Sequence, residues 1–169
     1  SSGSPTFTGR IATSIGRAVT ALGSLSVSYE PGAAVSDVEA GGFPQLVGSN
    51  PKVAFMAPSA LTEIAGGPDA IANEIAREAA LDGTLVVLAG TRLGTWSDEI
   101  DDLRVAQLAA VARAQSAGGS PAAMVESLVR SLQAEPVGSD PPWGWIGAGL
   151  LVAALGALAV LDRRVRRRP

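Results

Sequence analysis

The segment KVAFMAPSALTEIAGGPDAIANEIAREAALDGTLVVLA, residues 52–89, decides the fold of this chain. Residues 52–57 and 85–89 are apolar runs of strand length, and turn-forming residues bound both of them. Between them, Pro68 and Asp69 are suited to the start of a helix. The apolar stripe of this helix comprises Ile71, Ile75 and Ala79. Strand, helix and strand in this order predict a βαβ unit with a right-handed crossover, and the continuous apolar strands indicate that helices cover both faces of the sheet.

Further elements are predicted on both sides of this unit. Before it, the apolar spacing favours a helix over 11–22, a short strand over 25–29 and a weaker, glycine-broken helix over 34–47. After it, helices are expected over 98–115 and 121–133. The core candidates of the first of these two helices are Leu103, Val105, Leu108, Val111 and Ala112. The predicted fold class is therefore α/β, with a small sheet that contains the βαβ unit and is covered by helices.

An uncharged apolar stretch near the C-terminus predicts a transmembrane helix over 143–161. Its length is sufficient to cross a hydrocarbon layer of about 30 Å. Trp143 and Trp145 stand at its start, where indole rings favour the headgroup zone. A basic stub follows at 162–169, and its arginines are Arg163, Arg164, Arg166, Arg167 and Arg168. A buried core helix rarely has tryptophans at one end and arginines at the other, so the pattern favours a single-pass membrane anchor.

The arginine stub also predicts the orientation in the membrane. Positively charged flanks stay in the cytoplasm, which places the N-terminal part of the chain on the other side of the membrane. This topology requires an export signal, and we expect one that precedes Ser1 or has been removed. The opposite orientation would carry all the arginines of the stub across the bilayer.

The predicted organisation has five parts. A flexible leader at 1–8 precedes an extracytoplasmic α/β domain at 9–133, and a linker at 134–142 leads to the span and the stub. Within the span, small residues recur every fourth position and allow close helix contact, which suggests a homodimer through the transmembrane helix. The residues of this helix-packing face are Gly149, Ala153 and Ala157. The same spacing also arises by chance in a segment this rich in alanine and glycine.

The composition excludes several classes of function. The chain has no histidine and no cysteine. This removes Ser-His-Asp triads, thiol nucleophiles, disulfides and histidine-based metal sites, and we assign no catalytic residue. The net charge is −3, and because the stub is basic, the rest of the chain carries −7. A domain this acidic has no electrostatic footprint for nucleic acid, so no nucleic-acid partner is expected.

A cluster of carboxylates at 98–102 (DEIDD) is the densest polar feature of the sequence. Carboxylate oxygens so close together could bind Ca²⁺ or Mg²⁺, although the spacing is not that of an EF-hand loop. The candidate ligands are Asp82, Asp98 and Asp101. The alternative is a helix start, in which Thr95 or Ser97 caps the helix and acidic residues interact with its dipole.

The strand ends offer a second candidate position. In an α/β sheet, ligands favour the crevice beyond the C-terminal ends of the strands. Those ends are expected to present Glu30, Ser59 and the turn at 90–92. Arg92 is a candidate contact for an anion, although an exposed arginine is usually only solvated.

The segments KVAFMAPSAL, GGPDAIANEIARE and LDGTLVVLAGTRLG follow the order of elements that is typical of the TPM domain. The chain resembles this family of small α/β modules from exported and membrane-anchored proteins over residues 25–132. More narrowly, it resembles actinobacterial single-pass envelope membrane proteins, through the GTWSD turn at 94–98 and the Pro142-Trp143 entry to the span. The resemblance implies a two-layer or three-layer α/β fold. It also implies a link to repair of membrane complexes and, for some relatives, to phosphatase activity, although Thr91 departs from the aspartate-rich pattern of the family.

These observations predict a membrane-tethered extracytoplasmic interaction module that assists the assembly, maintenance or turnover of membrane or cell-envelope machinery. Its expected partners are a membrane or envelope protein and the lipid bilayer. Two alternatives stay open. One is a metal-assisted, phosphatase-like hydrolase that uses Asp82, Asp98 and nearby carboxylates. The other is an accessory subunit of a larger membrane complex, held chiefly through its span.

Overall fold

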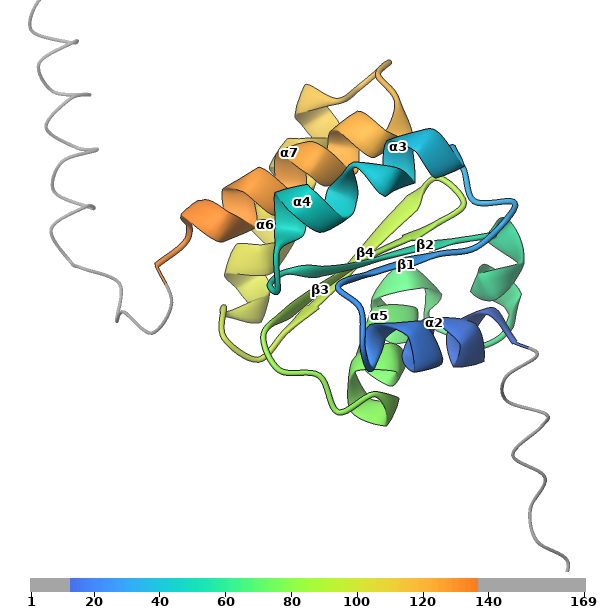
Figure 1. Cartoon of the computed structure of the whole chain (residues 1–169). Helices are drawn as coiled ribbons and strands as arrows, with labels where there is room; N and C mark the ends of the chain where they lie inside the picture. Colours follow the sequence, from blue (N-terminus) through green and yellow to red (C-terminus); the bar gives the residue numbers. More distant parts are fainter. Residues whose placement is uncertain (1–12, 137–169) are drawn as a thin grey trace, which may run out of the picture. The chain divides into compact units, whose positions relative to one another are not determined.

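Residues 13–136 are described by a computed structural model, in which four strands form one sheet (Figure 1). The elements in chain order are α2 (Ser14–Leu22), β1 (Val27–Tyr29), α3 (Asp37–Gly41), α4 (Phe43–Val47), β2 (Lys52–Met56), the short 3-10 helix η1 (Pro58–Thr62), α5 (Gly67–Glu78), β3 (Thr84–Ala89), β4 (Arg92–Ser97), α6 (Asp102–Gln115) and α7 (Pro121–Ala134). The predicted strands at 52–57 and 85–89 are confirmed as β2 and β3, and the helix predicted from Pro68 is confirmed as α5.

The sheet has the strand order β1-β2-β3-β4, with the first three strands parallel and β4 antiparallel to β3. Only Gly90 and Thr91 connect β3 to β4, which is too short for a crossover, so the chain reverses as a hairpin. Gly90 has a φ of 58°, in the left-handed region that glycine adopts without steric cost. The sequence prediction missed β4, because Gly94 and the polar residues around it give a weak strand pattern.

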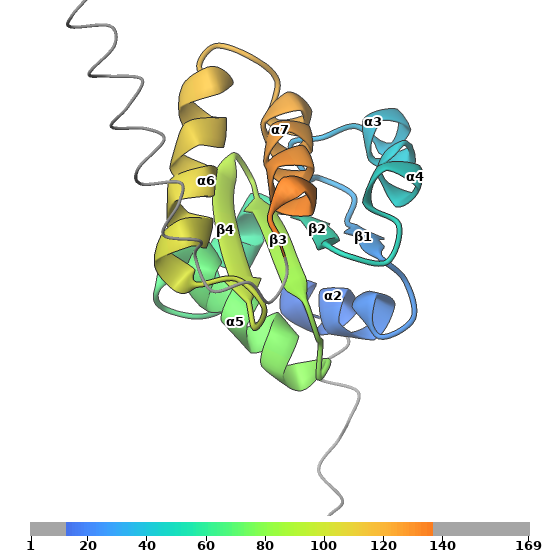
Figure 2. The same ribbon diagram turned by 90° about the vertical axis from the view of Figure 1, so that its left-hand side faces the viewer.

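The two connections between the parallel strands lie on opposite faces of the sheet. The α3–α4 connection packs with α6 and α7, whereas α5 packs with α2 and η1. Both connections lead to the next strand in the same direction across the sheet. Because they lie on opposite faces, their crossovers have opposite handedness. The β2–α5–β3 unit turns right-handed, as predicted, and the β1–α3–α4–β2 connection turns left-handed (Figures 1 and 2).

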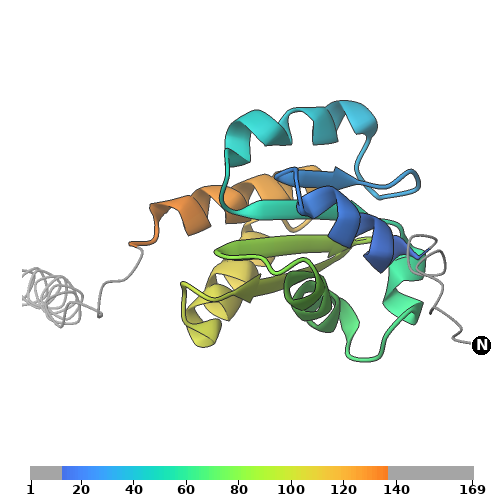
Figure 3. The same cartoon turned by 60° about the horizontal axis from the view of Figure 1, so that its bottom comes forward.

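Buried apolar side chains cover both faces of the sheet, which lies between two sets of helices (Figure 3). On β2, the alternation sends Val53 and Phe55 to the α3–α4–α6–α7 side, and Ala54 and Met56 to the α2–α5 side. Phe55 meets Phe43 of α4 edge to face, with ring centroids 4.9 Å apart. The structure therefore confirms the α/β class and shows the three-layer form.

The start of α6 differs from the prediction. The helix begins at Asp102, not at 98, and its N-cap is Asp101, whose carboxylate accepts a backbone hydrogen bond two residues on. The predicted caps, Thr95 and Ser97, lie in β4. The missed strand therefore displaced the predicted helix boundary by four residues.

Two of the predicted core residues of α6 are exposed. Leu103 is 68% exposed and Val111 is 48% exposed, whereas Val105, Leu108 and Ala112 are buried. The prediction fails because α6 is apolar around most of its circumference, so the spacing does not single out the inner face.

Within residues 13–136, no helix is both long enough and apolar enough to cross a membrane. The predicted leader at 1–8, the span at 143–161 and the stub at 162–169 lie outside the described residues, as does the linker beyond residue 136. The predicted packing face of Gly149, Ala153 and Ala157 also lies outside them.

The close approach of β4 to α5 generates a stability prediction. A Cβ atom on Gly94 would lie 2.3 Å from the carbonyl carbon and oxygen of Pro68, and the backbone cannot yield. We expect Gly94→Ala to lower the free energy of unfolding by about 3 kcal/mol or more, measured by denaturant unfolding. The control is Gly41→Ala in α3, where a Cβ meets nothing within 4 Å. Equal effects of the two substitutions would contradict this account of the β4–α5 contact.

Candidate functional site

The outer edge of β4 is sealed by two side chains. The pairing with β3 leaves the backbone groups of Leu93, Thr95 and Ser97 pointing away from the sheet. Arg113 of α6 donates a hydrogen bond from Nη2 to the Leu93 carbonyl oxygen at 2.9 Å. Asp69 of α5 accepts one from the Thr95 N–H, also at 2.9 Å. Side chains of the flanking helices thus occupy positions that a fifth strand would use.

A hollow of about 320 Å³ lies beside this edge, between α5, β4 and α6. Its lining residues are Asp69, Asn73, Thr95, Trp96, Ser97, Asp102, Val105, Ala106, Ala109 and Arg113. Asp69 and Arg113 already hold β4, and the Ser97 hydroxyl lies 2.9 Å from the Thr84 hydroxyl. Three of its polar side chains, those of Asp69, Arg113 and Ser97, are thus bonded within the fold.

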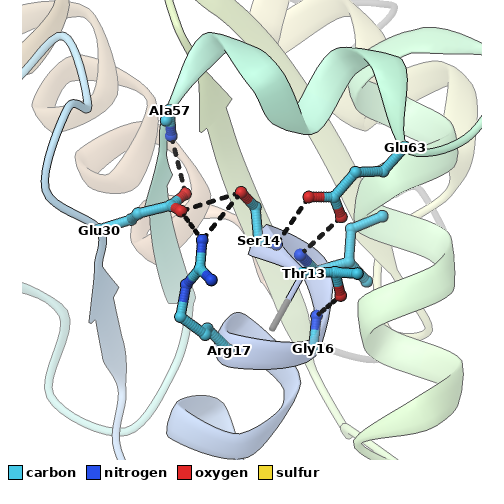
Figure 4. Close-up of polar contacts among 8 residues, drawn as sticks. Thr13, Ser14, Gly16, Arg17, Glu30, Ala57 and Glu63 are labelled. Atoms are coloured by element: carbon cyan, nitrogen blue, oxygen red, sulfur yellow. Dashed lines mark hydrogen bonds and ion pairs between the residues drawn. The ribbon is translucent and has the colours of Figure 1, made fainter. Parts of the chain in front are cut away.

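A second polar cluster lies at the C-terminal ends of β1 and β2 (Figure 4). Glu30, only 11% exposed in its side chain, follows β1 as predicted. Its carboxylate accepts hydrogen bonds from the Ala57 N–H at 3.0 Å and from the Ser14 hydroxyl at 2.9 Å, and it pairs with Arg17. The carboxylate thereby joins α2 to the ends of two strands.

Glu63 completes this cluster from the other side of α2. Its two oxygens accept hydrogen bonds from the backbone N–H groups of Ser14 at 2.6 Å and Ile15 at 3.0 Å. Thr13 accepts a further one from the Gly16 N–H (Figure 4). These groups are the unpaired donors of the first helical turn, so Glu63 caps a helix that lies 48 residues away in sequence. No local sequence signal could reveal this cap, and the cluster holds α2 against the strand ends.

The environment of Glu30 lowers its pKa. Burial of the carboxyl raises the pKa, but the hydrogen bonds from Ala57, Arg17 and Ser14, together with the Arg17 charge, outweigh this effect. Because the folded state has the lower pKa, Glu30 contributes stability above the ordinary carboxyl value of 4.5, and this contribution is lost as the pH falls through the folded-state value.

Two of the three predicted metal ligands, Asp98 and Asp101, have structural partners. Asp98 accepts a hydrogen bond from the Gly83 N–H at 2.7 Å, and its own N–H donates to the Gly83 carbonyl at 3.1 Å, which closes the turn before β3. Asp101 caps α6. Among residues 13–136, no group of three or more carboxylate, histidine or cysteine side chains could hold a metal ion. The Ca²⁺ or Mg²⁺ site at Asp82, Asp98 and Asp101 gains no support from this geometry and stays a prediction. A metal-dependent rise in melting temperature that Asp98→Asn removes would be its test.

A smaller hollow of about 210 Å³ lies at the N-terminal ends of β2 and β3. The side-chain amide of Asn50 lines this hollow, donates a hydrogen bond to Glu99 at 3.0 Å and accepts one from the Thr84 N–H at 2.9 Å. Glu135, which also lines it, pairs with Arg104 of α6 at 2.6 Å. These polar groups also connect distant segments of the domain.

The side chain of Arg92, the predicted anion contact, lies at the start of α5. A Cβ atom on Gly67 would be 3.4 Å from a guanidinium nitrogen of Arg92. An anion contact there stays a prediction.

The outer face of α6 is an exposed, largely apolar surface of the described domain. We define this α6 outer face by six exposed residues, Leu103, Ala106, Gln107, Ala110, Val111 and Ala114. Only Gln107 among them is polar. A surface of this kind, next to a hollow that contains Trp96, is typical of contact sites for other molecules.

These features define a small three-layer α/β domain in which polar side chains tie the fold and one helix presents an apolar surface. The family described as "Membrane protein Rv1476" matches residues 67–169, more than half of the chain, and the chain belongs to this family. It is therefore a membrane protein, and the matched range runs from α5 through the predicted span. No curated protein and no solved structure matches the chain.

The Glu30 cluster generates a prediction for stability and its pH dependence. We expect Glu30→Gln to lower the free energy of unfolding at neutral pH by about 1.5–3 kcal/mol, because a charged acceptor of several hydrogen bonds is lost. The difference from the unsubstituted protein should shrink below pH 4.5, which unfolding curves at several pH values would measure. The control is Glu126→Gln, which removes an exposed ion pair with Arg130 and should cost about 0.5 kcal/mol or less. A difference for Glu30→Gln that does not change with pH would contradict the assigned role.

Proposed function

We propose that this protein is a single-pass, membrane-tethered interaction module. Its α/β domain lies outside the cytoplasm, and it assists the assembly, maintenance or turnover of membrane or cell-envelope machinery. The observation that carries the proposal is the α6 outer face, an exposed apolar surface on a domain whose polar clusters serve the fold. Membership of a membrane-protein family supports the tether, and the tryptophan and arginine flanks of the predicted span support the orientation.

The chemistry of the described domain favours binding over catalysis. The chain offers no histidine or cysteine as a base or nucleophile. The buried carboxylate of Glu30 is held in its charged form by donors on three sides, and Asp98 is held by a turn. Carboxylates in such settings stabilise structure. The resemblance to the TPM domain, whose relatives have been linked to repair of membrane complexes and in some cases to phosphatase activity, is compatible with an assisting role.

The α6 outer face is distinguished from ordinary exposed residues by its extent. Val38 of α3 is 83% exposed, more than either Leu103 or Val111, but it stands between Asp37 and Glu39 on a helix of five residues. An isolated exposed apolar residue is normal on a protein surface. The α6 face continues over three helical turns, and Val38 therefore provides a matched control.

The test compares in-cell crosslinking patterns of full-length variants. We expect the protein to crosslink to a defined set of neighbours. In the double variant Leu103→Asp, Val111→Asp, the yield of these crosslinked products should fall at least about tenfold, because charges on a contact face must be desolvated. Mass spectrometry of the crosslinked products measures this. Val38→Asp should retain the pattern. If the α6 variant keeps every neighbour, the α6 outer face is not the contact surface and the proposal fails.

A further inference from the structure

The α6 helix is apolar on both sides. Its inner residues, Val105, Leu108, Ala109 and Ala112, pack on the sheet and on α7. Its outer residues form the exposed face defined above. A helix that is apolar all round is normally covered all round, so the outer face calls for a second covering layer.

The order of large and small residues on this face is self-complementary. In an antiparallel pair of identical helices, facing positions add up to a constant residue number. With the dyad between positions 108 and 109, Leu103 of one copy faces Ala114 of the other, and Val111 lies level with Ala106 along the helix axis. Gln107 then faces Ala110. Leu103, the largest side chain near the centre of the face, thus meets an alanine, and the alanines of the face allow the helices to approach closely.

We propose that the α6 outer face docks onto the α6 of a second copy of this chain, antiparallel and about a two-fold axis. The inference rests on the proposed function, because it names the occupant of the same surface. An isologous contact of this kind uses the same patch on both subunits, so a patch must complement itself to form one. An unrelated partner would impose no such relation between the two halves of the face.

The charges around the face fit the same arrangement. Asp102 and Arg113 stand near opposite ends of α6 and on the same side of it, since both line the larger hollow. The antiparallel pairing brings Asp102 of one copy beside Arg113 of the other, twice per dimer. Arg104 lies on the other side of the helix, where it pairs with Glu135, so like charges do not meet.

The charge of the whole domain favours this face over others for self-association. Outside its basic stub the chain carries a net charge of −7, so most surfaces of two copies repel each other. Between residues 103 and 114, α6 carries no acidic residue. The α6 outer face is thus a place where two acidic domains can meet without opposing carboxylates.

The absence of cysteine allows a direct test, because one introduced thiol is the only one in the chain. Gln107 lies beside the dyad, three residues from its symmetry-related copy along the helix axis. With helix axes about 8 Å apart, the two Cα atoms would be about 6 Å apart, within disulfide range. We therefore expect full-length Gln107→Cys in native membranes to form a disulfide-linked dimer on mild oxidation, read by non-reducing electrophoresis.

Two controls make the result specific. Val38→Cys is on a different, well-exposed surface and should stay mostly monomeric, with at least about tenfold less dimer. Gln107→Cys combined with Leu103→Asp and Val111→Asp should lose the dimer. Equal dimer yields for Val38→Cys and Gln107→Cys would show that two copies come close without a specific contact between their α6 helices, for example through their spans alone. That result would overturn the inference.

The outcome also separates this inference from the proposed function. If Gln107→Cys stays monomeric or links to a different protein, while the α6 aspartate variant loses its crosslinked neighbours, the occupant is not a second copy and the interaction function stands. If Gln107→Cys stays monomeric and the α6 aspartate variant keeps all its neighbours, both are overturned.

Discussion

The placement of β4 is the constraint on which the rest of the domain depends. A two-residue hairpin turns the chain back antiparallel to β3, and Gly94 lets the backbone of α5 lie directly against the new strand. Asp69 and Arg113 then satisfy outward backbone groups of β4. The sheet ends there, so α6 lies at its rim with only one side covered. The exposed apolar face is thus a consequence of where the sheet stops.

Polar side chains in this domain act mainly over long sequence distances. Glu63 caps α2, Glu30 joins α2 to two strands, and Asn50 links the start of β3 to Glu99. Lys52, the only lysine, donates to the carbonyl groups of Leu22 and Leu25 at 2.9 Å each, at and just after the C-terminal end of α2. Glu30 and Glu63 thus hold together the C-terminal ends of β1 and β2, the part of the sheet at which α/β proteins commonly bind ligands.

The sequence predicts those parts of the structure that depend on local patterns. The buried strands β2 and β3 and the helices α5 and α7 follow from apolar periodicity and from helix-start residues such as Pro68 and Pro121. The prediction from sequence missed β4, because a strand that is stabilised by neighbouring elements can form from residues with low intrinsic β-strand propensity. The prediction also assigned Leu103 and Val111 to the core, because the spacing of apolar residues along α6 does not show which of them other elements cover. The Glu63 cap joins segments too distant for any local pattern.

Accessibility of a single thiol on α6 tests the central claim, that another molecule covers the α6 outer face of an extracytoplasmic domain. Ala110→Cys changes this face least, and Val38→Cys reports an exposed surface elsewhere. Intact cells would be treated with a membrane-impermeant maleimide under reducing conditions. We expect Val38→Cys to react at once and Ala110→Cys to react only after denaturation. Equal labelling of both in intact cells would show an uncovered α6, and labelling of neither until the cells are opened would place the domain in the cytoplasm.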